Sequence, residues 1–524
     1  MSIRCSSFSR NGAAAVLAVC GFAASSAWAQ LRVCEWNVTN YGGASSRDPS
    51  FQTAIYGQVP TGLALAGQSM SPDIFVGEEF LSAGGVANFK LILNTAVGSP
   101  GDWEAAPFID GPDTDNAFFY RTSKVTYVRT VIVSQVTGST SLPPRNTLRY
   151  DIRLNGYGDV AGVNLSCYAA HMKAGSASTD QSRRLLEANK VRDNANGIDT
   201  NGAGTRLPAG NMFLFGADLN IQTSSQAAYQ RLIQSEANNT GRFFDPISTP
   251  GSWNNNSAFR FVHTQDPAVQ MDDRHDQILL GAGLLNGAGF EYIGNFGAVY
   301  STTTWNDPNH SYRSWGNDGT SFDQVLKITG NDMVGPVIAQ ALVTSANGLG
   351  HLPVILDLRV PAQVTSTTLI DFGSVPRNSA AAQSLIVSNS GNIGLWGGNG
   401  ISALNYSMSA TAGFSAPVGV FADAAGGSAN SHSITMNTSV VGLRTGQITI
   451  ASDAPDQPSR VVLLTGVVVG CPADFDGDGF VTGEDFDAYV AAFEAGDLIA
   501  DFDHDSFVTG EDFDAFVAAF ESGC

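Results

Sequence analysis

The chain repeatedly ends an apolar stretch on a polar side chain, most clearly in residues 213–220. Three large apolar residues lead into Gly216, and Asp218 and Asn220 follow two positions apart. In a strand, this spacing places both side chains on one face. A carboxylate at the end of a buried strand needs a polar or charged partner. A hard cation that also binds a phosphate oxygen is a suitable partner. A strand followed by an Asx turn is the purely structural alternative.

The same arrangement recurs along residues 31–360. Residues 31–37, 72–79 and 164–173 are apolar or alternating stretches that read as strands, and each ends on amide, acidic or basic side chains. Further predicted strands follow Asp276 and His351. The polar residues at these strand ends are Asn37, Glu79, His171, Asp218, Asn220, Asp276 and His351.

Few helical patterns separate the predicted strands. Residues 179–194 have helical spacing, with Ser178 or Thr179 as the cap, and a short helix is expected at 224–235. Residues 281–347 are expected to be rich in loops. Many strands with few helices favour a mixed, layered sheet sandwich over a repeated βαβ fold.

In this order, the strand ends resemble the motifs of the endonuclease/exonuclease/phosphatase superfamily, the metal-dependent phosphoesterases related to pancreatic deoxyribonuclease. The resemblance covers residues 31–360 and implies an α/β (α+β) four-layer sandwich. The matching segments are Trp36-Asn37, Pro72 to Glu79, His171 to Lys173, Ala217 to Asn220, Asp276, and His351 to Pro353.

The resemblance implies a metal site. Glu79 would be the principal ligand of Mg²⁺ or Mn²⁺, with Asn37 beside it. Magnesium keeps several waters and few protein carboxylates, which suits so small a set. Glu78 stands where the family often has Gln and is expected to lie behind the ligands.

The resemblance also implies roles in phosphodiester hydrolysis. Asp218 would orient or activate the nucleophile, and Asn220 would hold the phosphate. His351 would act as a base or electrostatic partner, His171 would assist the leaving group, and Asp276 would pair with an active-site histidine. Imidazoles suit these roles because their usual pKa lies near neutrality.

The chain departs from the family at one position beside a histidine. Leu349-Gly350 replaces Ser-Asp, so the carboxylate that orients the last histidine is missing, and Asp357 or Asp323 would have to replace it. The activity expected is that of a nuclease or phosphodiesterase acting on a phosphoester substrate, possibly nucleic acid. A phosphatase or phospholipid phosphodiesterase is the alternative within the fold, and a catalytically weakened binding or scaffold protein is the alternative outside it.

Composition changes after Val360. Residues 361–470 contain four aspartates, no glutamate and short alternating runs separated by Gly, Asn and Ser. This pattern predicts an immunoglobulin-like β-sandwich. Ile370 to Val375 and Val387 to Gly391 are similar to immunoglobulin-like domains of the cilia and centrosome group. No catalytic constellation is visible there, so a spacer or adhesion module is expected.

The segment 471–524 contains an internal repeat of 27 residues. Oxygen ligands at positions 1, 3, 5, 9 and 12, with a backbone carbonyl at 7, fit EF-hand Ca²⁺ loops. Ser506 replaces the turn glycine of the second loop. The expected ligands are Asp474, Asp476, Asp478, Phe480, Thr482 and Asp485 in the first loop, and Asp501, Asp503, Asp505, Phe507, Thr509 and Asp512 in the second.

Asp at position 12, and helices only after the loops, resemble a dockerin module. The resemblance implies a small α-helical unit and a cohesin-like protein partner. Residues 471–524 hold 15 Asp or Glu and no Lys or Arg, so calcium is expected to fold this module as well as bind to it.

The first 29 residues have the features of a signal peptide. Arg4 and Arg10 precede an apolar run, and Ala27-Trp28-Ala29 has the form of a cleavage site. No transmembrane segment is predicted, and the protein is expected to be secreted, periplasmic or on the cell surface.

Four cysteines remain after cleavage. Cys471 with Cys524 is the expected bridge, whereas Cys34 and Cys167 are either bridged or buried as small apolar residues.

Overall fold

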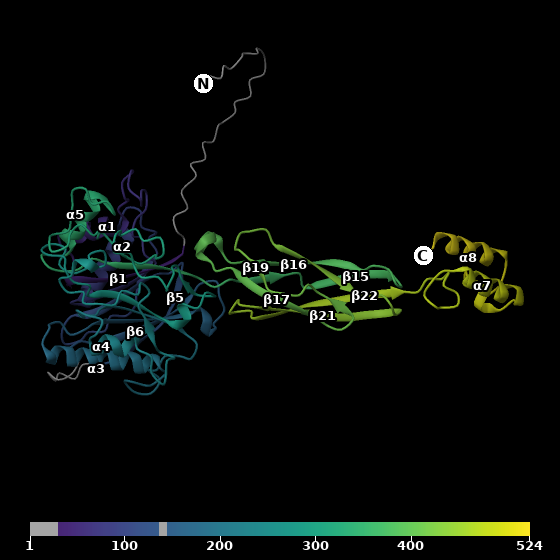
Figure 1. Cartoon of the computed structure of the whole chain (residues 1–524), viewed down its shortest axis with the longest axis horizontal. Coiled ribbons are helices and arrows are strands. Elements are labelled where there is room, and N and C mark those ends of the chain that lie inside the picture. Colours follow the sequence, from purple (N-terminus) through teal and green to yellow (C-terminus); the bar gives the residue numbers. More distant parts are fainter. Residues whose placement is uncertain (1–29, 136–143, 524) are drawn as a thin grey trace, which may run out of the picture.

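The computed structural model describes residues 30–135 and 144–523. They form an elongated molecule in which a large N-terminal unit, a β-sandwich and a small helical tail follow one another (Figure 1). The predicted signal peptide lies outside the described residues. Within the described ranges, no helix has the length and apolar character that crossing a membrane requires.

Two mixed sheets form the centre of the N-terminal unit. The first has seven strands in the order β11-β13-β1-β2-β4-β3, with β12 paired to β13, and the second has six in the order β5-β6-β7-β8-β10-β9. The first sheet comprises β1 (Leu31–Tyr41), β2 (Ile74–Phe80), β3 (Trp103–Ala105), β4 (Asp115–Arg121), β11 (Glu291–Tyr292), β12 (Arg313–Ser314) and β13 (Val354–Arg359). The second comprises β5 (Val125–Ser134), β6 (Thr147–Leu154), β7 (Asn164–His171), β8 (Met212–Asp218), β9 (Phe243–Phe244) and β10 (Asp276–Gly281).

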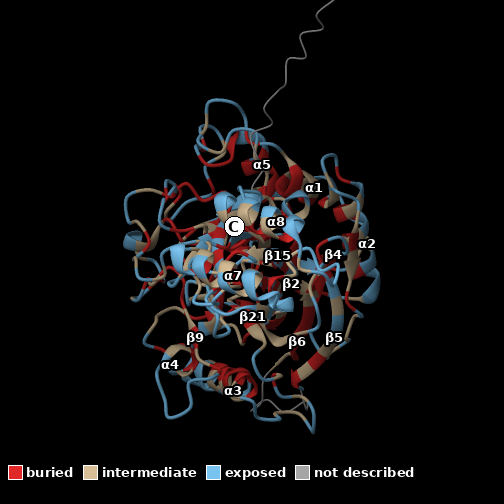
Figure 2. Cartoon of the chain, turned by 90° about the vertical axis from the view of Figure 1, so that its right-hand side faces the viewer, coloured by how far each residue is buried: buried red, intermediate tan, exposed pale blue. Residues whose placement is uncertain are grey.

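Helices cover the outer faces of the two sheets. α1 (Asp48–Tyr56), α2 (Ala83–Thr95) and α5 (Gly335–Ser345) lie beside the first sheet, and α3 (Ser178–Ala195) and α4 (Ala227–Ile233) beside the second (Figure 1). α3 contains seven buried residues, and much of it is coloured as buried in Figure 2. The result is a layered sandwich of mixed sheets with few helices.

The helix predictions need three corrections. α3 lies where it was expected, but Ala177 is its N-cap, and the Asp180 carboxylate accepts a hydrogen bond from the Ala177 amide. α4 is shorter than predicted, because it starts at Ala227. The region 281–347, predicted as loops, contains α5, which starts with a proline in its first turn.

Cys34 and Cys167 are free and buried, so the predicted alternative of a bridge between them is wrong. Glu35 faces the second sheet, because a side chain at Gly216 on β8 would begin 3.3 Å from the Glu35 Cβ. Neighbouring side chains of a strand alternate, so Cys34 points to the opposite face of β1, away from β7 and Cys167.

The middle unit consists of two further sheets around a separate apolar core. The four-stranded sheet has the order β14-β16-β20-β18 and the five-stranded sheet the order β15-β22-β21-β17-β19. Their strands are β14 (Val364–Ser366), β15 (Leu369–Pro376), β16 (Ala382–Asn389), β17 (Leu404–Ala410), β18 (Phe414–Ser415), β19 (Phe421–Asp423), β20 (Asn430–Met436), β21 (Gly442–Ser452) and β22 (Ser459–Val469).

One end of the middle unit is packed into the N-terminal unit. Trp396, Ile401 and Ala425 belong to the same buried apolar cluster as β1 and β2. Lys124 donates a hydrogen bond to the Leu395 carbonyl, and its ammonium lies 4.6 Å from the centre of the Trp396 ring. These contacts fix the middle unit against the N-terminal unit.

The tail has two helices, α7 (Gly483–Ala495) and α8 (Gly510–Ser522). Tyr489 and Phe516 stack between them with ring centres 3.8 Å apart. Cys471 is disulfide-bonded, whereas Cys524, its predicted partner, lies outside the described residues.

Candidate active site

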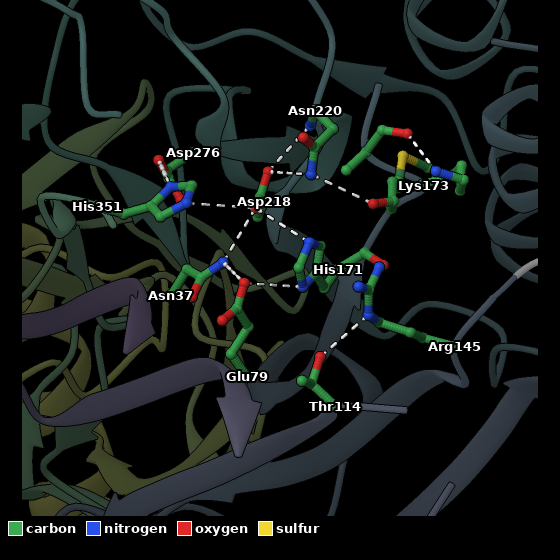
Figure 3. Close-up of polar contacts among 12 residues, drawn as sticks. Asn37, Glu79, Thr114, Arg145, His171, Lys173, Asp218, Asn220, Asp276 and His351 are labelled. Atoms are coloured by element: carbon green, nitrogen blue, oxygen red, sulfur yellow. Dashed lines mark hydrogen bonds and ion pairs between the residues drawn. The ribbon is translucent and has the colours of Figure 1, made fainter. Parts of the chain in front are cut away.

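Residues from the strand ends of both sheets meet in one cluster of polar contacts (Figure 3). β7 and β8 run parallel with His171 opposite Asp218, and Asp276 at the start of β10 is also opposite Asp218. β1 supplies Asn37 from the first sheet. The structure therefore brings together the residues predicted for the site, which are Asn37, Glu79, His171, Asp218, Asn220, Asp276 and His351.

Asn37 connects the two sheets within the site. Its Nδ2 donates hydrogen bonds to Glu79 Oε1 and to Asp218 Oδ2, each at 3.0 Å. Glu79 Oε2 accepts a further bond from the Asn40 amide. Glu79 also has a φ of 62°, an uncommon conformation for a residue with a side chain. Such strain persists where the surrounding structure fixes it, and it is frequent at functional sites.

His171 lies between two carboxylates. Its Nδ1 is 3.6 Å from Glu79 Oε1 and its Nε2 is 3.4 Å from Asp218 Oδ2. Burial, together with the nearby Arg145 guanidinium, lowers the pKa of His171 well below its usual value. The ring is therefore neutral near pH 7 and has one N–H to donate.

His351 has the opposite electrostatic character. Its Nδ1 is 2.7 Å from Asp276 Oδ2, and its Nε2 is 3.8 Å from Asp218 Oδ2. Burial alone would lower the pKa of His351, but the carboxylates of Asp276 and Asp218 outweigh it and raise the pKa to about 10. The imidazole is therefore cationic at neutral pH.

Asn220 holds Asp218 in place. Its backbone amide and its Nδ2 donate to Asp218 Oδ1 at 3.0 and 2.8 Å. Asp218 Oδ2 then faces Asn37 and the two histidines. Asn220, which was predicted to hold the phosphate, directs its Nδ2 at Asp218 and at the Met172 carbonyl.

The carboxylate that orients His351 is Asp276, whereas Asp357 and Asp323, the two substitutes predicted for the missing aspartate, are wrong. Asp357 pairs with Arg32, and Asp323 accepts from Gln270. Gly350 itself has a φ of +107°. A Cβ at Gly350 would lie 2.5 Å from both Thr39 Oγ1 and the Ala346 carbonyl oxygen, so a side chain does not fit there.

Sequence reasoning missed several residues around the site. Thr264 donates to Asp276 Oδ2 at 2.5 Å and so helps fix the partner of His351. Arg145 Nη1 is 3.5 Å from the His171 carbonyl, and its Nε donates to Thr114. Threonine and arginine in loops gave no signal in the sequence. Arg145 stands two residues before the strand β6, which was not predicted.

The donor set suits a hard divalent cation. Asp218, Asp276 and His351 each offer a ligand atom, and these atoms lie within 4.8 Å of one another. Glu79 adds a carboxylate beside Asp218. Asn37 holds these two acids together through its Nδ2, while its Oδ1 accepts from the Thr39 amide. The carboxylate groups of this set fit Mg²⁺ or Mn²⁺, whereas the protonated His351 ring has no lone pair for a metal and contributes its charge instead.

The tail contains two further acidic groups. Asp474, Asp476 and Asp485 form one, and Asp501, Asp503 and Asp512 form the other, with ligand atoms within 4.8 Å in each. These are positions 1, 3 and 12 of the two predicted loops. The other predicted ligands, Asp478, Phe480, Thr482, Asp505, Phe507 and Thr509, lie in the same loops, outside these groups.

Asp474 Oδ1 is buried without a hydrogen-bond partner. Its other oxygen is 3.4 Å from Arg377 of the middle unit. The carboxylate is therefore held in place by one oxygen while the other remains available to a cation.

No family model matches the chain, and no curated protein matches it. Solved structures to which this chain shows some similarity include the human Nocturnin catalytic domain with bound sulfate (11% identity, 63% of this chain and 93% of that chain, TM-score 0.33). Two further structures come from Bacteroides thetaiotaomicron. One is an endonuclease/exonuclease/phosphatase family protein (15% identity, 63% of this chain and 97% of that chain, TM-score 0.33), and the other is a mannosyl-6-phosphatase (15% identity, 63% of this chain and 99% of that chain, TM-score 0.29). At these identities and TM-scores, an activity can be inferred only from the geometry of the site.

Proposed function

We propose that the N-terminal unit is a metal-dependent hydrolase of phosphoester bonds with the endonuclease/exonuclease/phosphatase fold. The observation that carries the proposal is that Asp218 lies between a neutral histidine and a cationic one. Asn37 and Glu79 complete this arrangement from the other sheet. A phosphodiesterase activity suits it best, because hydrolysis of a diester requires both an oriented nucleophile and help for the leaving group.

The charge of each site residue determines its proposed role in hydrolysis. A bound Mg²⁺ or Mn²⁺ would neutralise charge on the phosphate oxygens, with Glu79 and Asn37 as its principal holders. Asp218, fixed by Asn220, orients the attacking water. The His351 imidazolium, held by Asp276, would stabilise negative charge on the phosphate. The neutral His171 ring donates its N–H to the departing oxygen.

The other parts of the chain are proposed to export and attach the hydrolase. The first 29 residues would direct export to the periplasm, the cell surface or the medium. The two acidic loops would bind Ca²⁺ and present a dockerin-like surface to a cohesin-like protein. What supports the calcium site is the buried Asp474 Oδ1, a carboxylate oxygen without a protein partner beside two more aspartates.

A substrate panel tests the proposal. The full chain without its first 29 residues is expected to hydrolyse bis(p-nitrophenyl) phosphate, DNA, RNA or a phospholipid with Mg²⁺ or Mn²⁺, and to lose activity with a chelator. Glu79→Ala should be inactive. The absence of turnover on every ester, or equal rates for wild type and Glu79→Ala, would refute the hydrolase.

A further inference from the structure

The mouth of the site has an uneven distribution of charge. Arg145 and Lys173 lie on the His171 side. On the His351 side lie four acidic residues, Asp266, Asp272, Asp273 and Asp323, which we call the acidic rim. Among the described residues, no Lys or Arg forms an ion pair with any member of the rim.

The acidic rim is attached directly to the backbone at His351. Gln265 forms a β-bridge with His351, and the Asp266 amide donates to the Gly350 carbonyl at 2.7 Å. The Thr264 amide donates to the Asp273 carbonyl in the same region. A group bound against the rim would therefore lie next to a phosphate held by His351.

Two carboxylate oxygens of the acidic rim, Asp266 Oδ1 and Asp273 Oδ1, are buried and have no hydrogen-bond partner. Burial, reinforced by the neighbouring carboxylates, raises the pKa of Asp266 and Asp272, and burial raises that of Asp273. Buried carboxylates without partners are costly, and a cation from outside the chain removes that cost.

His275 is a second, independent indication of a ligand. The residue is 6% exposed, and neither ring nitrogen has a hydrogen-bond partner. Its Nε2 is directed at Asp273 Oδ1, 3.6 Å away. A neutral imidazole has one N–H and one ring nitrogen with a lone pair to offer. A positively charged group with N–H bonds could donate a hydrogen bond to the imidazole and also form ion pairs with the carboxylates.

We propose that the acidic rim and His275 bind a protonated amine of the substrate, so that the enzyme acts on phosphodiesters that carry an aminoalkyl group beside the scissile phosphate. This rests on the proposed hydrolase function and narrows its substrate class. A quaternary ammonium has no N–H for His275. A long nucleic acid would bring further phosphates against the four aspartates, which repel them.

Three matched esters test the assignment, namely 2-aminoethyl, 2-(trimethylammonio)ethyl and ethyl p-nitrophenyl phosphate. With saturating Mg²⁺, kcat/KM should be at least about tenfold higher for the aminoethyl ester than for the ethyl ester, mainly through KM. The trimethylammonio ester should fall between them. Equal kcat/KM values for the aminoethyl and ethyl esters would overturn the proposal. If the trimethylammonio ester had the highest kcat/KM, the claim that the substrate amine donates an N–H would be wrong.

Two variants locate the effect. Asp272→Asn and Asp273→Asn should each remove most of the preference for the aminoethyl ester, by about tenfold, while kcat/KM for the ethyl ester stays unchanged. Asp159→Asn, an exposed carboxylate that pairs with Arg153, is the control and should keep the preference. If both rim variants kept the preference for the aminoethyl ester, the assignment would be wrong. It would also be wrong if Asp273→Asn lost one bound Mn²⁺, because the rim would then be a metal site.

The proposal and the hydrolase fail in different ways. If none of the three esters is hydrolysed, the hydrolase is wrong. Calorimetric binding of 2-aminoethyl phosphate, compared with ethyl phosphate and with Asp273→Asn, then still decides whether the rim binds an amine. Equal binding of both phosphates by wild type would end the proposal.

Discussion

The Nδ1 of His351 lies 2.7 Å from Oδ2 of Asp276, although the two residues are 75 positions apart in the chain. This contact fixes which nitrogen of the ring faces Asp218. It also supplies the carboxylate that Gly350 lacks.

Replacing Asp276 by Asn should therefore reduce turnover more than binding. The cationic form of His351 loses its partner, and kcat is expected to fall by about 100-fold with little change in KM. The measurement is steady-state hydrolysis of bis(p-nitrophenyl) phosphate at saturating Mg²⁺. Asp323→Asn is the control, and an equal loss in both variants would contradict the role of Asp276.

Glu78 and Glu79 form a matched pair of neighbouring acids with different surroundings. Asn37 donates hydrogen bonds to both Glu79 and Asp218, whereas Glu78 is fully buried with the Glu35 carboxyl group beside it. Glu79→Gln should weaken Mg²⁺ or Mn²⁺ binding by at least about tenfold in calorimetry and abolish activity. Glu78→Gln should retain metal binding and stabilise the fold, because a neutral amide costs less to bury than a carboxylate. Equal metal affinities in the two variants would count against Glu79 as the principal ligand.

Glu187 of α3 should make stability depend on pH. Burial raises its pKa to about 8, above the value of about 4.3 for an exposed glutamate. The folded state therefore favours the protonated form. Its contribution is complete below about pH 4.3 and is lost as the pH rises to about 8.

Glu187→Gln keeps an acceptor for the Lys173 amide, which bonds Glu187 Oε2 at 3.1 Å. Between pH 5 and 9, the free energy of unfolding of wild type should fall by a few kcal/mol more than that of the variant. Chemical denaturation of the N-terminal transition at several pH values measures this difference. Parallel pH profiles would show that Glu187 is not responsible.

The second loop of the tail carries backbone strain that the first avoids. Ser506 has a φ of 76°, and Gly479 at the same position of the first loop has a φ of 101°. Ser506→Gly should therefore stabilise the second loop by about 1 kcal/mol and raise its Ca²⁺ affinity several-fold. Calcium titration with circular dichroism and calorimetry measures both effects. Asp487→Asn, an exposed aspartate of α7 outside the loops, should change neither, and an unaltered spectrum on adding calcium to wild type would refute the loops altogether.

Sequence reasoning predicted the site because its residues obey a local rule. Asn37, His171 and Asp218 each follow an apolar run, so their place at a strand end could be inferred from their neighbours. The partner of His351 could be named only through the resemblance, because no local rule shows that Thr264 and Asp276 approach Gly350. The acidic rim was not predicted as a group, because Asp266 and Asp323 come from segments separate from Asp272 and Asp273.

The helices over the first sheet were missed for a different reason. α2 contains Gly84 and Gly85 in its first turn, which suggests a loop. A Cβ at Gly85 would lie 2.7 Å from the Tyr41 carbonyl oxygen, so the glycine permits a close approach of helix and strand. Tertiary packing thus required a residue that helix propensity disfavours.

The insertion of Trp396, Ile401 and Ala425 into the core of the N-terminal unit has a mechanical consequence. A middle unit joined in this way is a rigid spacer and does not rotate freely relative to the N-terminal unit. If the tail were held on a surface, the reactive face would stand at a set height and direction above it. Such an enzyme would reach only substrates within a narrow range of distances from the surface. Its rate on immobile substrates would therefore depend on the position at which the tail is attached.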